Sequence, residues 1–398
     1  MRKALFISIS VLLVFSIGYT KNIVLFVGDG MGPTYVTATR LYLREKKQKL
    51  HLDTFKKIAI VQTFAADSVV TDSAASATAF ACGVKTNNGV LGEDDTAVFM
   101  QKDGKKVNSI VHFAKQKGMS VGLVTTTRIT HATPAAFYAH TNSRDDEQEI
   151  AHQLIKSGVD VLLGGGLKYF TPEMQEELKK QNYTVVKTLE EFNKIDSKKT
   201  QKLFGLLSDS HLAYELDRTS ANIKEPSLTE LVLKAHEVLK KNPKGYFLMV
   251  EGGRIDHAGH ENDALRAIHD TIAFDKAIAA YQLVVTSKDT LVLVTADHET
   301  GGLSINGYPN LGIGLFEHVK EGDKKLDYPV LTWATGPGFG VKETAQGLFT
   351  EKQPAAFLRD YSAHSGVDVY LYGWGVGSEV VQGTLDNTDI FKIMKKAL

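Results

Sequence analysis

Six apolar, β-branched runs recur along the chain, and helical patterns lie between many of them. The runs occupy residues 23–27, 58–64, 121–125, 159–163, 246–250 and 291–295. Strands that are almost continuously hydrophobic and alternate with helices are typical of parallel sheets covered on both faces. The pattern therefore predicts an α/β fold with a mostly parallel central sheet and helices on both of its faces.

Three helices are indicated most clearly. Residues 74–81 are strong helix formers that follow the second run. Ser227 and Glu230 have the spacing of a capping box, which predicts a helix over 228–240. Residues 386–398 place their apolar side chains at helical spacing, so we expect an amphipathic helix at the C-terminus.

The composition changes along the chain suggest one large domain with additions. Segment 171–226 is richer in Lys, Glu, Ser and Asn, and segment 302–332 is richer in Gly, Pro and Tyr. We interpret both segments as insertions on a single catalytic domain that covers residues 19–398. A chain of 398 residues with 43% hydrophobic content is long enough to bury a core of that size.

The first 18 residues are interpreted as a signal peptide. Arg2 and Lys3 precede an apolar run at 4–17, which is shorter than the roughly 20 residues of a spanning helix. We therefore expect a periplasmic or secreted protein without stable membrane insertion after signal removal; a retained N-terminal anchor is the alternative. Cys82 is the single cysteine, so an intramolecular disulfide is excluded and the fold depends on its core, metal ions or a partner subunit.

The balance of charged residues argues against a nucleic-acid partner. Lys and Arg number 46, and Asp and Glu also number 46. Such a balanced chain has no global field that favours nucleic acid, so we expect no nucleic-acid partner. Any anionic ligand must be held by local groups.

Polar side chains follow five of the predicted strands. They are Asp29 after 23–27, Asp72 and Ser73 after 58–64, His131 and Thr133 after 121–125, Glu251 after 246–250, and Asp297 and His298 after 291–295. Ligands of open parallel sheets bind beyond the carboxyl ends of the strands. We therefore expect these carboxylates, hydroxyls and imidazoles to meet at one edge of the sheet.

Ser73 is placed where a strand gives way to a helix. The first N–H groups of a helix have no intrahelical partner and the helix dipole is positive there, so a phosphoryl group would be favoured and the serine alkoxide stabilised. Taken alone, an Asp-Ser pair is more typical of an ordinary helix cap. The other clusters favour the interpretation of Ser73 as a nucleophile.

Two carboxylates and two imidazoles lie within residues 251–260. Asp256 and His260 are four residues apart, so both side chains reach one ion if the segment is helical. With Asp297, His298 and His364 there are enough oxygen and nitrogen ligands for two zinc sites. Each histidine alone is more typical of a loop or turn, and we treat His51, His112, His152, His211, His236, His269 and His318 as structural or surface residues.

Six motifs carry a further signal. They are VGDGMG at 27–32, TDSAASATA at 71–79, HATPAA at 131–136, EGGRIDHAGH at 251–260, TADHETGG at 295–302 and HSG at 364–366. In this order they resemble the motifs of the alkaline phosphatase family, and the resemblance runs from Asn22 to the C-terminus. It implies an alkaline phosphatase that hydrolyses small phosphate monoesters through a covalent phosphoserine at Ser73.

The resemblance also implies a metal set and a homodimer. One zinc would be held by Asp256, His260 and His364; a second by Asp29, Asp72, Asp297 and His298; and a third ion by Asp29, Thr133 and Glu251. Arg144 aligns with the family's phosphate-binding arginine, whose fork of donors suits two phosphoryl oxygens. His131 and His257 replace an aspartate and a lysine of some bacterial members, which leaves Mg²⁺ or Zn²⁺ open for the third ion.

Three other functions are considered. A phosphodiesterase or sulfatase of the same broad superfamily would share metal ligands, but Arg144 favours a monoester and the sulfatase pattern is absent around Ser73 and Cys82. A secreted zinc- or phosphate-binding module would not need Ser73 beside Asp72. A zinc protease would need a His-Glu-x-x-His helix, which the sequence lacks.

Overall fold

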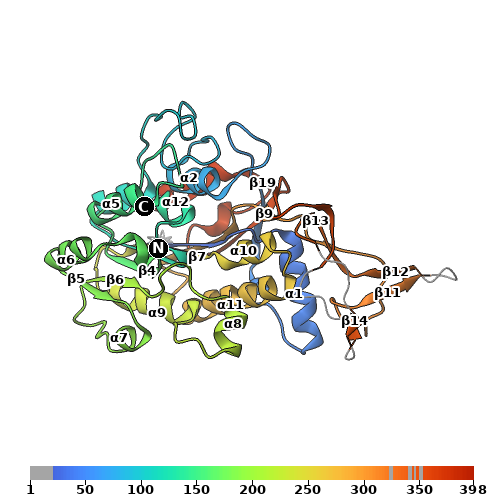
Figure 1. Ribbon diagram of the computed structural model, residues 1–398. Helices are drawn as coiled ribbons and strands as arrows, with labels where there is room; N and C mark the ends of the chain where they lie inside the picture. The colour runs from blue at the N-terminus through green and yellow to red at the C-terminus, as the bar shows by residue number, and fades with distance from the viewer. Residues whose placement is uncertain (1–20, 322–325, 339–342, 345–346, 349–352) are drawn as a thin grey trace, which may run out of the picture.

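The computed structural model describes residues 21–321, 326–338, 343–344, 347–348 and 353–398, so the expected signal peptide lies outside the described residues. Within them, ten strands form one central sheet (Figure 1). In spatial order these are β19 (Thr384–Asp386), β2 (Lys57–Gln62), β18 (Val369–Gly375), β8 (Thr290–Ala296), β1 (Asn22–Gly28), β7 (Tyr246–Gly252), β3 (Ser120–Arg128), β4 (Val161–Gly165), β6 (Lys202–Leu206) and β5 (Tyr183–Val186).

The sheet is mostly parallel, which confirms the predicted fold class. Strand β1 lies between β7 and β8 and is parallel to both. Strand β18 is the exception, because it is antiparallel to β8 and to β2. All six apolar runs of the sequence are strands of this sheet, so their carboxyl ends lie at one edge.

One of these strands is less buried than we predicted. Ile58 and Ile60 of β2 are 46% and 43% exposed, while Ala59 and Val61 between them are buried. The prediction of a fully buried strand was wrong here because β2 lies next to the sheet edge, where only one of its faces is covered. Tyr370, which pairs with Ile60, extends the uncovered face onto β18.

Helices cover both faces of the sheet in two layers (Figure 1). One layer holds α1 (Pro33–Glu45), α9 (Leu228–Leu239) and α11 (Ala264–Gln282). The other holds α2 (Ser73–Cys82), α3 (Ile110–Gln116), α4 (Ala132–Ala135) and α12 (Asn387–Ala397). The remaining helices are α5 (Glu147–Lys156), α6 (Pro172–Lys180), α7 (Leu189–Asn193), α8 (Glu215–Ser220) and α10 (Arg254–His260).

The three predicted helices are present with their end signals. Helix α2 ends at Gly83, whose φ of 73° suits glycine at a helix C-terminus. Ser227 and Glu230 form the expected capping box at the start of α9. In α12, Ile390, Phe391 and Met394 are buried, as the amphipathic pattern predicts. No helix within the described ranges is long and apolar enough to cross a membrane.

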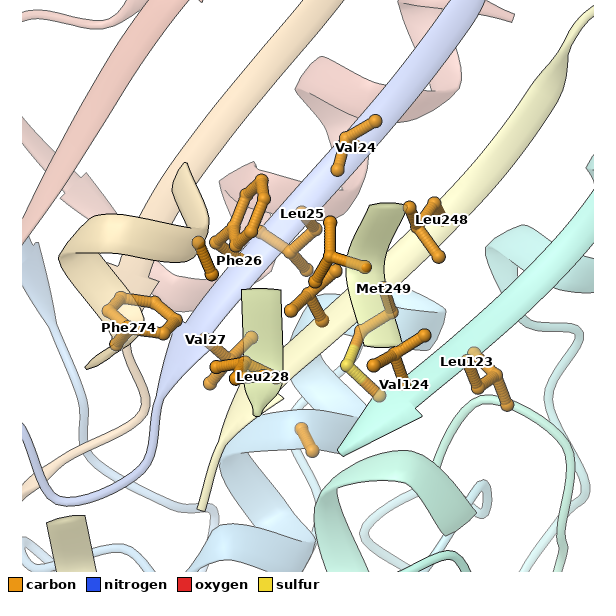
Figure 2. Packing of buried hydrophobic residues seen from close by; sticks show 14 of the residues in the cluster. Val24, Leu25, Phe26, Val27, Leu123, Val124, Leu228, Leu248, Met249 and Phe274 are labelled. Carbon is orange, nitrogen blue, oxygen red and sulfur yellow. The ribbon is translucent and has the colours of Figure 1, made fainter. Parts of the chain in front are cut away.

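The core is continuous across the central strands. Figure 2 shows Val24 and Phe26 of β1 near Leu248 of β7 and Phe274 of α11. The Phe26 ring meets the rings of Phe274 and Tyr281 edge to face, with centroids 6.0 and 5.8 Å apart. Full burial of such a side chain stabilises the fold by about 1.5–3 kcal/mol. This packing fixes the strands from which the polar residues project.

Two segments that we interpreted as insertions differ in their relation to the sheet. Segment 171–226 contributes β5 and β6, so part of it continues the main sheet. The described strands of segment 302–332 belong to small sheets that extend to one side (Figure 1). The short strands outside the main sheet are β9 (Glu299–Thr300), β10 (Ser304–Ile305), β11 (His318–Glu321), β12 (Leu326–Pro329), β13 (Leu331–Gly336), β14 (Glu343–Thr344), β15 (Gly347–Leu348), β16 (Ala355–Leu358) and β17 (His364–Ser365).

Candidate active site and metal centre

The polar residues at the carboxyl ends of β1, β7 and β8 lie together at one edge of the sheet. The three strands are in register, so that their last residues stand opposite one another. Asp29 and Asp297 are therefore neighbours, and both are completely buried. The Gly30 N–H, in a turn with φ of 68°, donates to Asp297 Oδ1 at 3.0 Å and links the two turns.

Ser73 is the first residue of α2 and faces this cluster. It is buried, and its Oγ lies 3.2 Å from His298 Nε2. The same imidazole nitrogen is 3.5 Å from Asp29 Oδ1 and 3.3 Å from Asp297 Oδ2. The helix N-terminus thus places a hydroxyl against a group of side chains that can bind a cation.

A first candidate metal group consists of Asp256, His260 and His364. Asp256 and His260 lie on α10, and their Oδ2 and Nε2 atoms are 3.2 Å apart, as the four-residue spacing predicts. His364, on β17, brings its Nε2 within 3.1 Å of His260 Nε2 and 3.7 Å of Asp256 Oδ1. Three ligand atoms at these separations can share one ion.

Two more groups share Asp29. One is Asp29, Asp256 and His298, and the other is Asp29, His131 and Glu251. Thr133, in α4, lies near Glu251: burial raises the pKa of Glu251, and the hydroxyls of Thr125, Thr133 and Thr127 oppose that rise. The third group is therefore bordered by the threonine that we expected there.

The chemistry of this cluster fits cations. Among the described residues, Asp29 Oδ1 and Oδ2, Glu251 Oε1 and Asp297 Oδ2 are buried and have no hydrogen-bond partner. A buried carboxylate without a partner is strongly unfavourable unless a cation or proton compensates it. The unsatisfied oxygens thus point to sites for two or three divalent ions.

Burial and neighbouring charges shift the pKa values of these acids. Burial, and after it the Asp297 and Asp256 carboxylates, raise the pKa of Asp29 well above its ordinary value. Burial raises the pKa of Asp297 to about 8. Burial also opposes ionisation of Asp256, but His260, His364 and His298 together outweigh it and lower the pKa of that carboxyl well below its ordinary value. Without cations, part of the site would therefore hold protons.

Arg144 is oriented by Asp72. Its Nη1 donates to Asp72 Oδ2 at 2.9 Å, and the same oxygen accepts the Gly89 N–H at 3.0 Å. Asp72 Oδ1 accepts the Ala75 N–H at 2.9 Å as the helix cap. Both oxygens of Asp72 are thus engaged, and none of the three candidate metal groups among the described residues includes it. The structure places Asp72 beside the arginine rather than among the other candidate ligands.

Three imidazoles border the Arg144 side of the site. His131 Nε2 is 3.3 Å from Arg144 Nη2, and the His257 ring centroid is 5.5 Å from that of His131. Burial and the nearby Arg144 lower the pKa of His131 well below its ordinary value. Burial and Arg254 lower the pKa of His257 to about 3, so both rings are neutral near pH 7.

His211 is the third of these imidazoles, and our sequence analysis treated it as structural. Its ring lies 4.4 Å from that of His257 and 5.6 Å from that of His131, centroid to centroid. It follows β6, so the rule that located the other residues at strand ends would have located His211 as well. We missed it because the segment around β6 was interpreted as an insertion.

Comparisons with known proteins agree with this geometry. The alkaline phosphatase family matches residues 20–398. The human tissue-nonspecific isozyme of alkaline phosphatase is 33% identical over 441 residues, which cover 95% of this chain and 83% of that protein. Alkaline phosphatase 4 of Bacillus subtilis (strain 168) is 35% identical over 422 residues, covering 94% of this chain and 89% of that protein.

Solved structures are similar over nearly the whole chain. The alkaline phosphatase of the Antarctic bacterium TAB5 has a TM-score of 0.76 at 29% identity, covering 95% of this chain and 98% of that one. The Thermus thermophilus alkaline phosphatase has a TM-score of 0.78 at 27% identity, covering 96% and 92%. A variant of the TAB5 enzyme in which an aspartate replaces a histidine has a TM-score of 0.76 and has Mg bound in a site called M3. The chain belongs to the alkaline phosphatase family of phosphate-monoester hydrolases.

Proposed function

We propose that Ser73 is the nucleophile of phosphate-monoester hydrolysis and that a covalent phosphoserine forms on its Oγ. The observation that carries the proposal is the 3.2 Å contact between Ser73 Oγ and His298 Nε2 at the N-terminus of α2. In this scheme the Ser73 oxygen attacks phosphorus, the bond to the ester oxygen breaks, and the alcohol leaves. Water then releases phosphate from Ser73 and regenerates the hydroxyl.

We propose that two zinc ions and a third ion, Mg²⁺ or Zn²⁺ in its place, complete this site. Asp256, His260 and His364 would hold one zinc, and the group of Asp29, Asp256 and His298, with Asp297 beside it, would hold the other. Asp29, Glu251 and His131, with Thr133 beside them, would hold the third ion. When bound, the ions supply Lewis acidity and neutralise the charge that spreads over the phosphoryl oxygens.

We propose that Arg144 binds the phosphoryl group through its guanidinium fork. Arg144 Nη1 donates to Asp72 Oδ2, so in this proposal Asp72 orients the arginine rather than binding a metal ion as the resemblance implied. His131 lies against Nη2 and His257 lies behind His131, so neutral rings confine the arginine without repelling it. The bound phosphoryl group would thus meet a fixed donor geometry rather than a mobile side chain.

We also propose a periplasmic or secreted homodimer. The exposed apolar face of β2 and β18, formed by Ile58, Ile60 and Tyr370, supports a protein interface because exposed apolar groups of this kind mark interaction surfaces. The expected signal peptide supports export. Sequencing the N-terminus of protein recovered from the culture medium or periplasm tests the export and the cleavage together.

The nucleophile can be tested by trapping the intermediate. Ser73→Ala should abolish both turnover of nitrophenyl phosphate and acid-stable labelling by a ³²P-phosphorylated substrate. Ser76→Ala is a matched control because Ser76 lies one turn further along the same helix, is equally buried, and has no hydrogen-bond partner among the described residues. Normal turnover in the Ser73 variant would remove Ser73 from the mechanism, and faster hydrolysis of the diester or the sulfate would indicate a different esterase.

A further inference from the structure

A row of aromatic rings leads from the nucleophile to the surface. His298, which contacts Ser73, stacks on His364 with ring centroids 3.6 Å apart and an interplanar angle of 19°. The His364 and His260 centroids are 4.9 Å apart. The outer face of His260 then stacks on Tyr361, with centroids 4.0 Å apart and an angle of 17°. The row therefore begins at a buried hydroxyl and ends at a tyrosine.

Tyr361 is the exposed end of this row. The residue is 53% exposed, although one face of its ring is covered by His260. Burial raises the pKa of the Tyr361 phenol, and the negative charge of Asp256 raises it further. The other ring face is therefore available to a ligand that extends outward from the candidate metal groups.

The row of rings runs in the direction in which the leaving group must depart. In phosphoryl transfer the leaving oxygen departs roughly in line with the attacking oxygen and on the opposite side of phosphorus. The inner side of the site is closed by Asp29, Glu251 and Asp297, which are fully buried. The body of the leaving group must therefore extend outward, and the row from Ser73 to Tyr361 runs in that outward direction.

Two apolar side chains lie close by on the segments that carry the site. Val69 is exposed shortly before Ser73 in the sequence, and Val367 is exposed shortly after His364. The two segments touch, because a Cβ on Gly366 would lie 3.1 Å from the Val69 carbonyl oxygen. Val69 and Val367 thus add exposed apolar side chains to two segments that carry candidate site residues.

We propose that Tyr361 is a specificity-determining residue that binds the aromatic ring of the leaving alcohol by stacking. This inference rests on the proposed function. The preferred substrates are phosphate monoesters with an aromatic ring one or two bonds from the ester oxygen. The chemical step is unchanged, and the gain comes from a ring contact outside the phosphoryl site.

The kinetic test compares benzyl phosphate with ethyl phosphate, whose alkoxide leaving groups are similar in basicity. Tyr361→Ala should lower kcat/KM for benzyl phosphate by roughly five-fold, which is the size expected for one aromatic contact. The kcat/KM for ethyl phosphate should stay within about two-fold of the wild-type value. Tyr361→Phe should retain the wild-type preference because stacking needs the ring and not the hydroxyl. Tyr308→Ala is the control, since Tyr308 is 85% exposed and has no ring contact with a candidate metal ligand among the described residues.

A binding measurement separates this inference from the proposed function. Calorimetric titration of the metal-loaded enzyme with benzylphosphonate and ethylphosphonate, which lack the ester bond, should show tighter binding of the benzyl compound in wild type and in Tyr361→Phe, but not in Tyr361→Ala. Equal losses for both ligands in Tyr361→Ala would overturn the inference and leave Tyr361 as a support for His260. If no ester is hydrolysed while the benzyl preference in binding persists, the proposed function fails and the aromatic site stands.

Discussion

Removing the metal ions should make the stability of the protein fall with pH between pH 7 and pH 8. Asp29 and Asp297 are completely buried side by side. Burial raises the pKa of Asp297 to about 8, and burial together with Asp297 raises the pKa of Asp29 well above its ordinary value. In the unfolded chain both carboxyls ionise near pH 4, so at pH 7 the folded, metal-free protein retains protons that the unfolded chain has lost.

The sign and size of the effect follow from this difference. Stability falls with pH wherever the folded state binds more protons, by about 1 kcal/mol per pH unit for each retained proton. We therefore expect the free energy of unfolding to decrease by about 1–2 kcal/mol from pH 7 to pH 8. Burial lowers the pKa of His131 and His298, which opposes this slope below about pH 6.5, where the unfolded imidazoles take up protons. Above pH 7 the slope comes from buried carboxyls, and these include Asp270, whose pKa burial raises to about 8 outside the candidate metal groups.

Urea unfolding of chelator-treated and zinc-loaded protein at pH 7.0, 7.5 and 8.0 measures this slope. Zinc-loaded protein should be more stable and should show a smaller slope, because bound cations keep Asp29 and Asp297 ionised while Asp270 still releases its proton. Asp297→Asn is the matched variant, since the amide oxygen can still accept the Gly30 and His298 N–H groups that now reach Oδ1. Without metal ions, the free energy of unfolding of Asp297→Asn should fall less steeply from pH 7 to pH 8 than that of the wild type. A metal-free wild type whose stability is constant or rises from pH 7 to pH 8 would refute the assignment of a buried acid cluster.

Three further changes test other parts of the structure. Arg144→Lys keeps the charge but loses the fork, so kcat/KM for nitrophenyl phosphate should fall roughly 10- to 100-fold; an unchanged value would exclude bidentate phosphate binding. Phe26→Ala should lower the free energy of unfolding by about 3–5 kcal/mol in urea titrations, because Phe26 is fully buried; a loss below about 1 kcal/mol would contradict the packing. Ile60→Lys puts a charge on the proposed dimer interface, so light scattering should show a shift from dimer to monomer. If the variant stays dimeric, the interface lies elsewhere.

The sequence predicted the site well where the sheet alone determines position. Asp29, Glu251 and Asp297 lie at or just after the ends of parallel strands that are in register, so their proximity follows from strand order without knowledge of side-chain packing. The spacing of Asp256 and His260 likewise needed only a helical turn. These features depend only on local periodicity and on the parallel arrangement of the strands, and the pattern of apolar residues predicts both.

The remaining features depend on contacts between distant segments. The exposure of Ile58 depends on whether a helix covers that face of the sheet, and the pattern of β2 itself does not specify this. The role of Asp72 depends on which partner lies within 3 Å, and the structure gives Arg144 at 2.9 Å. Tyr361 stacks on His260 across a separation of 101 residues in the sequence, and no local signal indicates such a contact.

The hydrogen bonds around the acid cluster show how the protein orients its candidate ligands. Asp297 Oδ1 accepts two backbone N–H groups, whereas Oδ2 has no hydrogen-bond partner among the described residues. Glu251 Oε2 accepts the hydroxyls of Thr125 and Thr127, whereas Oε1 is likewise unpaired there. Each carboxylate is thus fixed through one oxygen and presents the other to a cation.

Asp29 differs from this arrangement in a way that matches its position. Asp29 and Asp256 each belong to two of the three candidate metal groups. Asp256 Oδ1 accepts the Thr300 hydroxyl, whereas both oxygens of Asp29 lack a hydrogen-bond partner within the described part of the chain. A carboxylate that bridges two ions needs both oxygens, whereas one that serves a single ion can give the other oxygen to the protein. The distribution of protein hydrogen bonds, and not only the proximity of the acids, therefore supports Asp29 as the bridge between two cation sites.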